Sequence, residues 1–126
     1  VVARTDDPAY HAAAAIAANG AAALAFAAVS ILERIGFDKR AAERAIGGLL
    51  GSVGENVQRL GVPGALTGPV ARGDAQTVER HRSAVRRLGR DASAAYDAVL
   101  PIIVRTARAA GLSRAKAAKI RRQTER

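Results

Sequence analysis

The sequence predicts an all-α fold, a bundle-like single domain of about five helices over residues 1–126 with a long, central, alanine-rich helix. No stretch alternates apolar and polar residues with the period of two that a half-buried strand requires. Aromatic residues make up only 3% of the chain while hydrophobic residues make up 49%, so alanine supplies much of the apolar content. Because alanine is the best helix former and a small side chain, this composition favours closely packed helices.

The first helix is expected to begin at Asp7-Pro8, where Asp can cap free amides and Pro is tolerated. It should run to about Ile35 and stop at Gly36. Almost every residue in 12–32 is apolar, which is long enough for a membrane span. Alanine gains little from lipid, and Asn19-Gly20 interrupts the run. We therefore expect a central helix buried on all sides by other helices, and no membrane.

A second helix is predicted from the cap Asp38 to about Leu60, closed by Gly61. Its glycines stand at positions 47, 48, 51 and 54 and leave one face smooth. Each glycine costs a helix about 1 kcal/mol relative to alanine, so we expect this face to pack closely on the alanine-rich helix. A phosphate-binding loop is the alternative, but the G-x-G-x-x-G spacing and a preceding strand are both absent.

Three further helices are expected after a Gly- and Pro-rich break over residues 62–74. The first of them should start at the cap Asp74 and end at Gly89, and the second should start at Asp91 or Ser93. A last segment, residues 114–126, follows the cap Ser113. It carries six Lys and Arg and little apolar surface apart from Ile120, so we expect this basic tail to fray.

Charge and composition exclude several function classes. The chain has no Cys and two His, which excludes thiol catalysis and a Cys/His metal cluster, so no metal site is expected. The net charge of +9 arises in residues 75–126, which hold thirteen Lys and Arg against four Asp and Glu. That excess predicts weak, nonspecific binding of polyanions, but the interleaved aromatics of a nucleic-acid surface are missing. Without a signal-peptide pattern or a starting Met, the chain is expected to be a cytoplasmic piece of a longer protein.

Three polar residues fall in one sector of the alanine-rich helix. At about 100° per residue, His11, Asn19 and Ser30 lie at about 0°, 80° and 100°. A His and an Asn on one stripe can hydrogen-bond an oxygen of a substrate, and His11 can exchange a proton near neutral pH. The plainer alternative is that each side chain satisfies a polar group in a helical core.

The segment 66–74, with the sequence Leu-Thr-Gly-Pro-Val-Ala-Arg-Gly-Asp, is the second candidate site. A helix start at Pro69 would leave the following amides free for an anion, with Thr67 and Arg72 beside them. The alternative is an ordinary connection between helices. His81, in the next helix, is uninformative by itself.

These residues resemble the C-terminal domain of a bacterial family that pairs an N-terminal Rossmann domain with a helical domain of unknown function. The resemblance covers residues 8–110 and leaves 111–126 outside. It is carried by the run Tyr10-His11-Ala12-Ala13-Ala14 with Asn19, the segment 66–74, Thr77 and His81. Such proteins are similar in plan to pyrroline carboxylate reductase, phosphogluconate dehydrogenase and ketopantoate reductase. The resemblance implies a fold like the C-terminal domain of phosphogluconate dehydrogenase.

The resemblance also implies a function: a domain that forms a homodimer and closes the substrate pocket of an NAD(P)-dependent oxidoreductase. The missing Rossmann domain would hold NAD(P), so this chain alone binds no cofactor and is inactive. His11 and Asn19 would be catalytic, although several relatives use a Lys on the equivalent helix and this chain has none there. The residues expected to contact a small-molecule substrate are Thr67, Gly68, Pro69, Arg72, Asp74 and His81.

Two alternatives remain open at this point. The chain can be a structural or interaction module in which the alanine and glycine faces form a homodimer and no polar residue is catalytic. It can also be a helical nucleic-acid binder that uses its basic C-terminal half. We favour the oxidoreductase hypothesis, with dimerisation through the first two helices.

Overall fold

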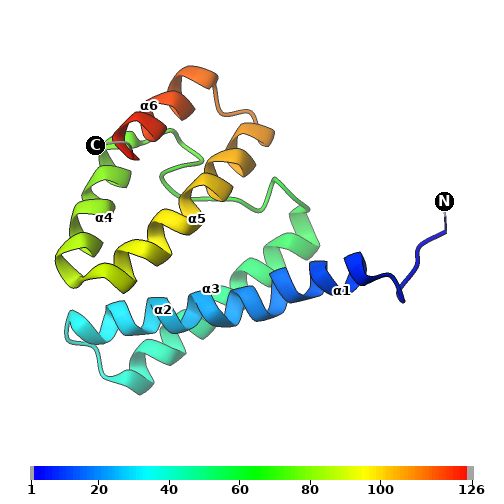
Figure 1. The fold of residues 1–126 in the computed structure, drawn as a ribbon, viewed down its shortest axis with the longest axis horizontal. Helices are drawn as coiled ribbons and strands as arrows, with labels where there is room; N and C mark the ends of the chain where they lie inside the picture. The colour runs from blue at the N-terminus through cyan, green and yellow to red at the C-terminus, as the bar shows by residue number, and fades with distance from the viewer. Residues whose placement is uncertain (1, 125–126) are drawn as a thin grey trace. The chain divides into compact units, whose positions relative to one another are not determined.

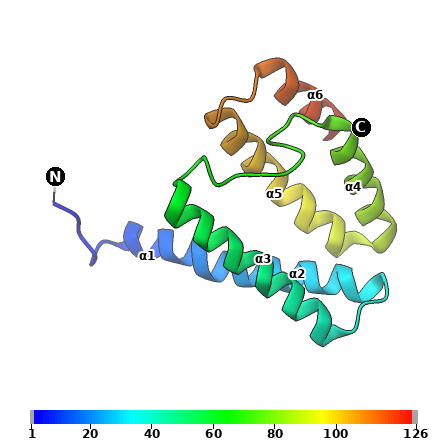
Figure 2. The same cartoon turned by 180° about the vertical axis from the view of Figure 1, so that it is seen from behind.

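The computed structural model describes residues 2–124, which are all-α as the sequence predicts, with no strand among them. The helices are α1 (Pro8–Ala14), η1 (Ala15–Asn19), α2 (Gly20–Arg34), α3 (Lys39–Leu60), α4 (Ala75–Leu88), α5 (Arg90–Ala109) and α6 (Arg114–Thr124). Figure 1 and Figure 2 show the two opposite views of the ribbon. The chain forms two compact units, Val1–Leu50 and Gly51–Arg126, called here the N-terminal and C-terminal units. The expectation of a single domain stays a prediction.

Capping residues start four helices where the sequence predicts. Asp7 accepts a hydrogen bond from the amide of Ala9 at 2.8 Å, and Asp38 accepts one from Ala41 at 3.1 Å. Asp74 accepts one from the amide of Thr77 at 3.0 Å, and Ser113 accepts one from the amide of Lys116 at 3.2 Å. The predicted start of α5 is wrong. This helix begins at Arg90 with Gly89 as its cap, so the two expected start residues, Asp91 and Ser93, both lie inside the helix.

The first helix departs from regular geometry in its middle. The amide of Gly20 bonds to the carbonyl of Ala15, five residues back, which is the pattern of a π-helix. This segment, η1, ends at Asn19. Because a π-turn holds more residues than an α-turn, the 100° steps used to place His11, Asn19 and Ser30 in one sector do not apply across it.

The expectation that the first helix is buried on all sides is wrong. None of α1, η1 and α2 contains a buried residue, and Ala42 of α3 is the buried residue described in the N-terminal unit. Within this unit α2 runs beside the first part of α3 as a helical hairpin (Figure 1). One neighbouring helix covers only one side of another. Pro8–Arg34 is also long and apolar enough, by length and composition, to cross a membrane.

Open space surrounds the glycine face of α3. A Cβ atom added at Gly47, Gly48, Gly51 or Gly54 would have no atom within 4 Å apart from its own helix backbone. The expected tight packing against the alanine-rich helix is therefore wrong for Gly47 and Gly48, which share the N-terminal unit with that helix. The absent side chains leave open space instead, and Gly47 borders a groove between α2 and α3.

The C-terminal unit holds the hydrophobic core, and the basic tail is part of it. In both views α6 lies beside the start of α4 and the end of α5. Ile120 is 0% exposed and Ala117 is also buried, in one cluster with Val78, Leu100 and Val104. The expectation of a frayed tail is wrong for residues 114–124, while 125–126 lie outside the described residues. Two apolar residues three positions apart share one helix face, which is sufficient to anchor α6.

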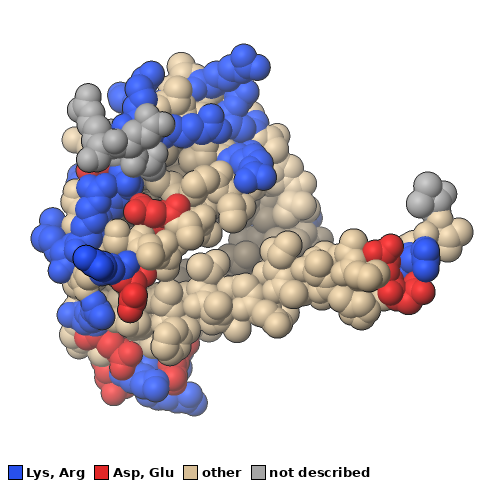
Figure 3. Space-filling model, viewed as in Figure 1, with Lys and Arg blue, Asp and Glu red and all other residues tan. Residues whose placement is uncertain are grey.

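Lys and Arg side chains gather over α4 and α6, as Figure 3 shows. The exposed basic residues of α6 are Arg114, Lys116, Lys119, Arg121 and Arg122. Their helix has no acidic residue in its first turn to offset them. Weak binding of polyanions by this surface stays a prediction.

Candidate functional site

A small cavity in the C-terminal unit lies between α4, α5 and the loop before α4. Its volume is about 200 Å³. His81 projects into its wall from α4 and Tyr96 from α5, and Nδ1 of His81 lies 3.2 Å from the hydroxyl oxygen of Tyr96. The two rings meet edge to face, with 6.0 Å between their centroids. The remaining lining residues are Leu66, Thr67, Pro69, Val70, Val99, Leu100 and Ile103.

Hydrogen bonds around Asp74 place the loop against this cavity. The amide of Asp74 donates to the carbonyl of Pro69 at 2.8 Å and closes the loop. The Asp74 carboxylate accepts from the amide of Thr77 at 3.0 Å and from its hydroxyl at 2.7 Å. These two bonds to Thr77 lower the pKa of Asp74 from its ordinary value of 3.8, with the positive charges of Arg72 and Arg80 acting in the same direction. Asp74 therefore starts α4 and holds the loop.

A buried arginine joins the two helices that carry His81 and Tyr96. Arg82 is 3% exposed, and its Nε donates to Oδ1 of Asp97 at 3.2 Å. Its Nη1 lies 3.8 Å from a carboxylate oxygen of Glu79. Arg82 follows His81 and Asp97 follows Tyr96 in the sequence, so this ion pair fixes the spacing of α4 and α5 at the level of the cavity.

Tyr96 is half-buried, and this burial raises the pKa of its hydroxyl above 10.0. The phenol is neutral throughout the physiological range and keeps its hydrogen available for donation. Sequence reasoning missed Tyr96. Its residue type could have drawn attention to it. The chain has only two tyrosines and two phenylalanines, so an aromatic side chain with a polar end is rare in this sequence.

The structure brings together part of the predicted substrate-contacting set. Thr67, Pro69 and His81 line the cavity, and Gly68 takes a positive φ of 95° between the first two. The prediction of an anion site at a helix start at Pro69 is wrong. No helix starts there, since residues 69–73 form turns and the amide of Arg72 donates to the carbonyl of Gly68.

Two more predicted residues, Arg72 and Asp74, do not line the cavity. The Arg72 side chain is exposed, and the Asp74 carboxylate is occupied by its bonds to Thr77. Asp74 therefore acts on the cavity through the loop that it closes. A direct contact of either residue with a substrate stays a prediction.

The predicted catalytic pair lies in the N-terminal unit. His11 is exposed and its ring meets that of Tyr10 edge to face, 5.6 Å between centroids. Asn19 is exposed in the π-segment. The alternative in which both side chains satisfy polar groups in a core is therefore wrong. The convergence of this pair with the loop 67–74 stays a prediction.

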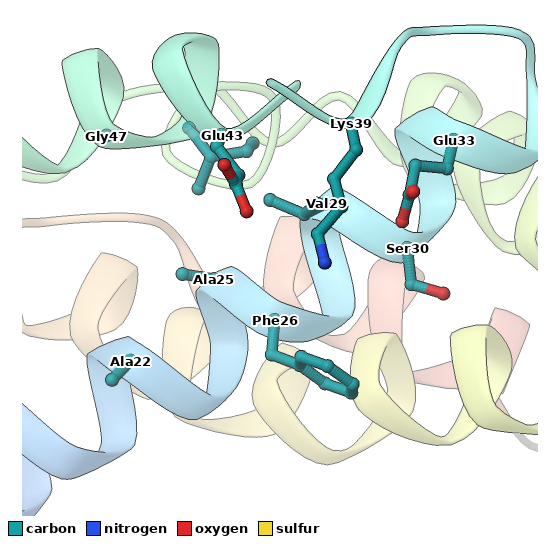
Figure 4. Close-up of a pocket in the computed structure, with 10 residues that line it drawn as sticks. Ala22, Ala25, Phe26, Val29, Ser30, Glu33, Lys39, Glu43 and Gly47 are labelled. Carbon is teal, nitrogen blue, oxygen red and sulfur yellow. The ribbon is translucent and has the colours of Figure 1, made fainter. Parts of the chain in front are cut away.

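The third polar residue of that helix, Ser30, lines the groove between α2 and α3. This groove has a volume of about 370 Å³. Figure 4 shows Lys39 and Glu43 extending from α3 toward α2, with Phe26 and Val29 on the other wall. The walls are apolar in their middle and charged at the end near Glu33. Such a groove can accept apolar side chains of another helix.

Among the described residues, no group of three or more His, Asp or Glu side chains is placed to hold a metal ion. No curated protein and no solved structure matches the chain. One family model does match, over residues 1–102, and that family is described as a domain of unknown function, DUF2520. The match covers most of the chain and includes the first helix, the loop before α4, His81 and Tyr96. The protein therefore belongs to the DUF2520 family.

Proposed function

We propose that the chain is the dimerisation and substrate-pocket domain of a two-domain NAD(P)-dependent oxidoreductase. A single observation carries the dimerisation part: the apolar helix Pro8–Arg34 contains no buried residue. Phe26 is 80% exposed and Ile16 is 78% exposed. Exposed apolar surface of this extent marks an interaction site in a soluble protein.

A second copy of the chain is the occupant that fits this surface. Alanine and glycine make the hairpin of α2 and α3 smooth, so another helix can approach its backbone closely. The open space beside Gly47 and Gly48 and the groove between α2 and α3 can receive large side chains such as Phe26 from the partner. A two-fold axis presents the same patch on both copies, so one surface supplies both the protruding residues and the hollow.

A membrane is a poorer fit to the same helix. The span contains His11, Asn19, Glu33 and Arg34, and most of its apolar residues are alanine. Large apolar side chains, which drive helix insertion into lipid, are few. The exposed polar side chains of His11 and Asn19 fit a protein interface or a pocket better than a bilayer core.

The oxidoreductase part rests on the resemblance of His11, Asn19, the segment 66–74 and His81 to two-domain enzymes with an N-terminal Rossmann domain. The cavity between α4 and α5 supports it, because three residues that the resemblance implies as substrate contacts line one small pocket. NAD(P) would belong to the partner domain. This chain would supply the dimer interface and one wall of the substrate site, and by itself would be inactive.

Sedimentation velocity tests the dimer. We expect the chain to sediment as a dimer at micromolar concentration. Phe26→Glu should raise the dissociation constant about 100-fold or more, because dimer formation would bury an unpaired charge. Val62 is 75% exposed and lies outside the hairpin, so Val62→Glu is the matched control and should remain dimeric. A monomeric wild-type chain at 100-fold higher concentration, about 100 µM, would overturn the proposal.

Lipid binding is measured in parallel by flotation with phosphatidylcholine vesicles. The proposal expects the chain to stay in solution. Partitioning of the wild-type chain into the vesicles, reduced by Phe26→Glu and unchanged by Val62→Glu, would replace the dimer with a membrane as the occupant of the helix.

A further inference from the structure

We propose that the cavity lined by His81 and Tyr96 binds a small neutral molecule with an apolar body and one carbonyl group, whose oxygen accepts a hydrogen bond from the Tyr96 hydroxyl. This inference deepens the proposed function, on which it rests only for calling the bound molecule a substrate. It assigns the chemical class of the ligand and a further contacting residue, Tyr96. Neither follows from membership of the family.

The lining of the cavity selects an apolar, uncharged ligand. Six of its nine residues present hydrocarbon walls: Leu66, Pro69, Val70, Val99, Leu100 and Ile103. None of the nine is Asp, Glu, Lys or Arg. A charged ligand would lose its hydration without gaining an ion pair with any of these four residue types, which is costly in an apolar site. The three polar lining residues, Thr67, His81 and Tyr96, supply hydrogen bonds that orient the ligand.

In the His81 tautomer that carries its hydrogen on Nδ1, the pairing with Tyr96 leaves the phenol able to donate to the ligand. A phenol has one hydrogen to donate and lone pairs to accept. When Nδ1 of His81 carries its hydrogen, it donates to the Tyr96 oxygen across their 3.2 Å separation. The Tyr96 hydrogen is then free for another acceptor, and a carbonyl oxygen entering the cavity is such an acceptor. Burial raises the pKa of Tyr96, which keeps that hydrogen in place.

The position of the pair is held by contacts outside the cavity. Arg82 and Asp97, the residues that follow His81 and Tyr96, form the buried ion pair between α4 and α5. The loop that carries Thr67 is closed by the bond from Asp74 to Pro69. A rigid frame of this kind lets two polar groups meet a ligand without large reorganisation.

The size of the cavity limits the ligand. About 200 Å³ corresponds to about six or seven water-sized groups at about 30 Å³ each. This is below the range of drug-sized pockets, which begins at about 300 Å³. The site therefore takes a molecule of the size of a six-membered ring ketone, or the reacting end of a longer one.

Cyclohexanone is the probe for this site, and the full chain is titrated with it by methyl and aromatic NMR. The proposal predicts saturable shifts at Tyr96, Val99 and Ile103 at millimolar concentration. Tyr96→Phe should weaken binding about 5- to 10-fold, the effect of removing one hydrogen bond. Val99→Phe should abolish binding by filling the cavity. Ile102→Ala, a change on the same helix outside the lining, is the matched control and should bind as the wild type does.

A charged analogue tests the neutrality of the ligand. Cyclohexanecarboxylate should bind at least 10-fold more weakly than cyclohexanone because its carboxylate finds no Lys or Arg in the lining. Thermal unfolding of each variant, followed by circular dichroism, checks that it is folded. If Tyr96→Phe fails to fold, Val99→Phe carries the comparison.

Three results would overturn the inference: no saturable shift of the cavity residues, equal affinity of the wild type and Tyr96→Phe, or tighter binding of the carboxylate. The proposed function fails separately. A chain that binds cyclohexanone in the cavity but sediments as a monomer keeps the ligand site and loses the dimer. A dimeric chain whose cavity residues show no shift keeps the dimer and loses the ligand site.

Discussion

The guanidinium of Arg82 is buried between two helices and donates from Nε to Oδ1 of Asp97, fifteen residues later in the chain, at 3.2 Å. The two partners differ in their surroundings. Arg82 is almost fully enclosed, whereas the Asp97 side chain keeps 44% of its surface exposed. The contact between α4 and α5 is thus held by a buried guanidinium and a partly solvent-exposed carboxylate.

Arg82→Ala should therefore destabilise the protein by about 2 kcal/mol. The change removes a buried ion pair and leaves a void, while the hydrated carboxylate of Asp97 limits the loss to less than that of a fully buried pair. Urea denaturation followed by circular dichroism measures this. Arg87→Ala, an exposed change on the same helix, is the control and should stay within about 0.5 kcal/mol of the wild type. Equal stability of the two variants would contradict the structural role of Arg82.

The cap at Asp74 should make stability depend on pH. Its bonds to Thr77 lower the pKa of Asp74 in the folded state below the ordinary value of 3.8. A lowered pKa adds stability that is fully present well above pH 3.8 and is lost as the pH falls through the folded-state pKa. The difference in unfolding free energy between the wild type and Asp74→Asn should therefore be constant near neutrality and shrink in acid. A difference that does not change with pH would contradict the assignment.

Gly73 and Gly54 should respond in opposite directions to alanine. Gly73 has a φ of 70°, and a Cβ there would lie 2.6 Å from Cδ of Lys116. Gly73→Ala should destabilise the protein by about 1 to 3 kcal/mol through backbone strain and this close contact. Gly54 is helical with open space around it, so Gly54→Ala should stabilise by about 0.5 to 1 kcal/mol. Urea denaturation of both variants measures the contrast, and a neutral Gly73→Ala would mean that α6 does not pack on the loop.

His11→Ala should lower turnover of the longer enzyme proposed to contain this chain by about 100-fold, as the loss of a positioned proton-transfer group does. The measurement is the rate of NAD(P)H oxidation by the two-domain protein. Because His11 is exposed here, the same change should leave the melting temperature intact. A lowered melting temperature with unchanged turnover would give His11 a structural role instead.

The helix starts and stops, apart from the start of α5, were predictable from the sequence because their causes are local. A cap such as Asp38 or Ser113 bonds to an amide three residues away, and Gly36 and Gly111 end their helices through their own positive φ. The all-α class follows from the same short-range signals. The family resemblance directed attention to the loop 67–74 and His81, and three of its residues line one cavity.

The remaining features depend on contacts between residues distant in the sequence. His81 and Tyr96 are fifteen positions apart, so only the packing of α4 on α5 brings them together. Ile120 sits in a segment that reads as a charged tail, and its burial depends on the hollow that Val78 and Leu100 leave for it. The alanine-rich helix shows most clearly what could not be predicted from the sequence. Its sequence alone determined that it is helical and apolar. An apolar surface has no built-in direction, so only the tertiary structure decided that none of the residues of α1, η1 and α2 is buried.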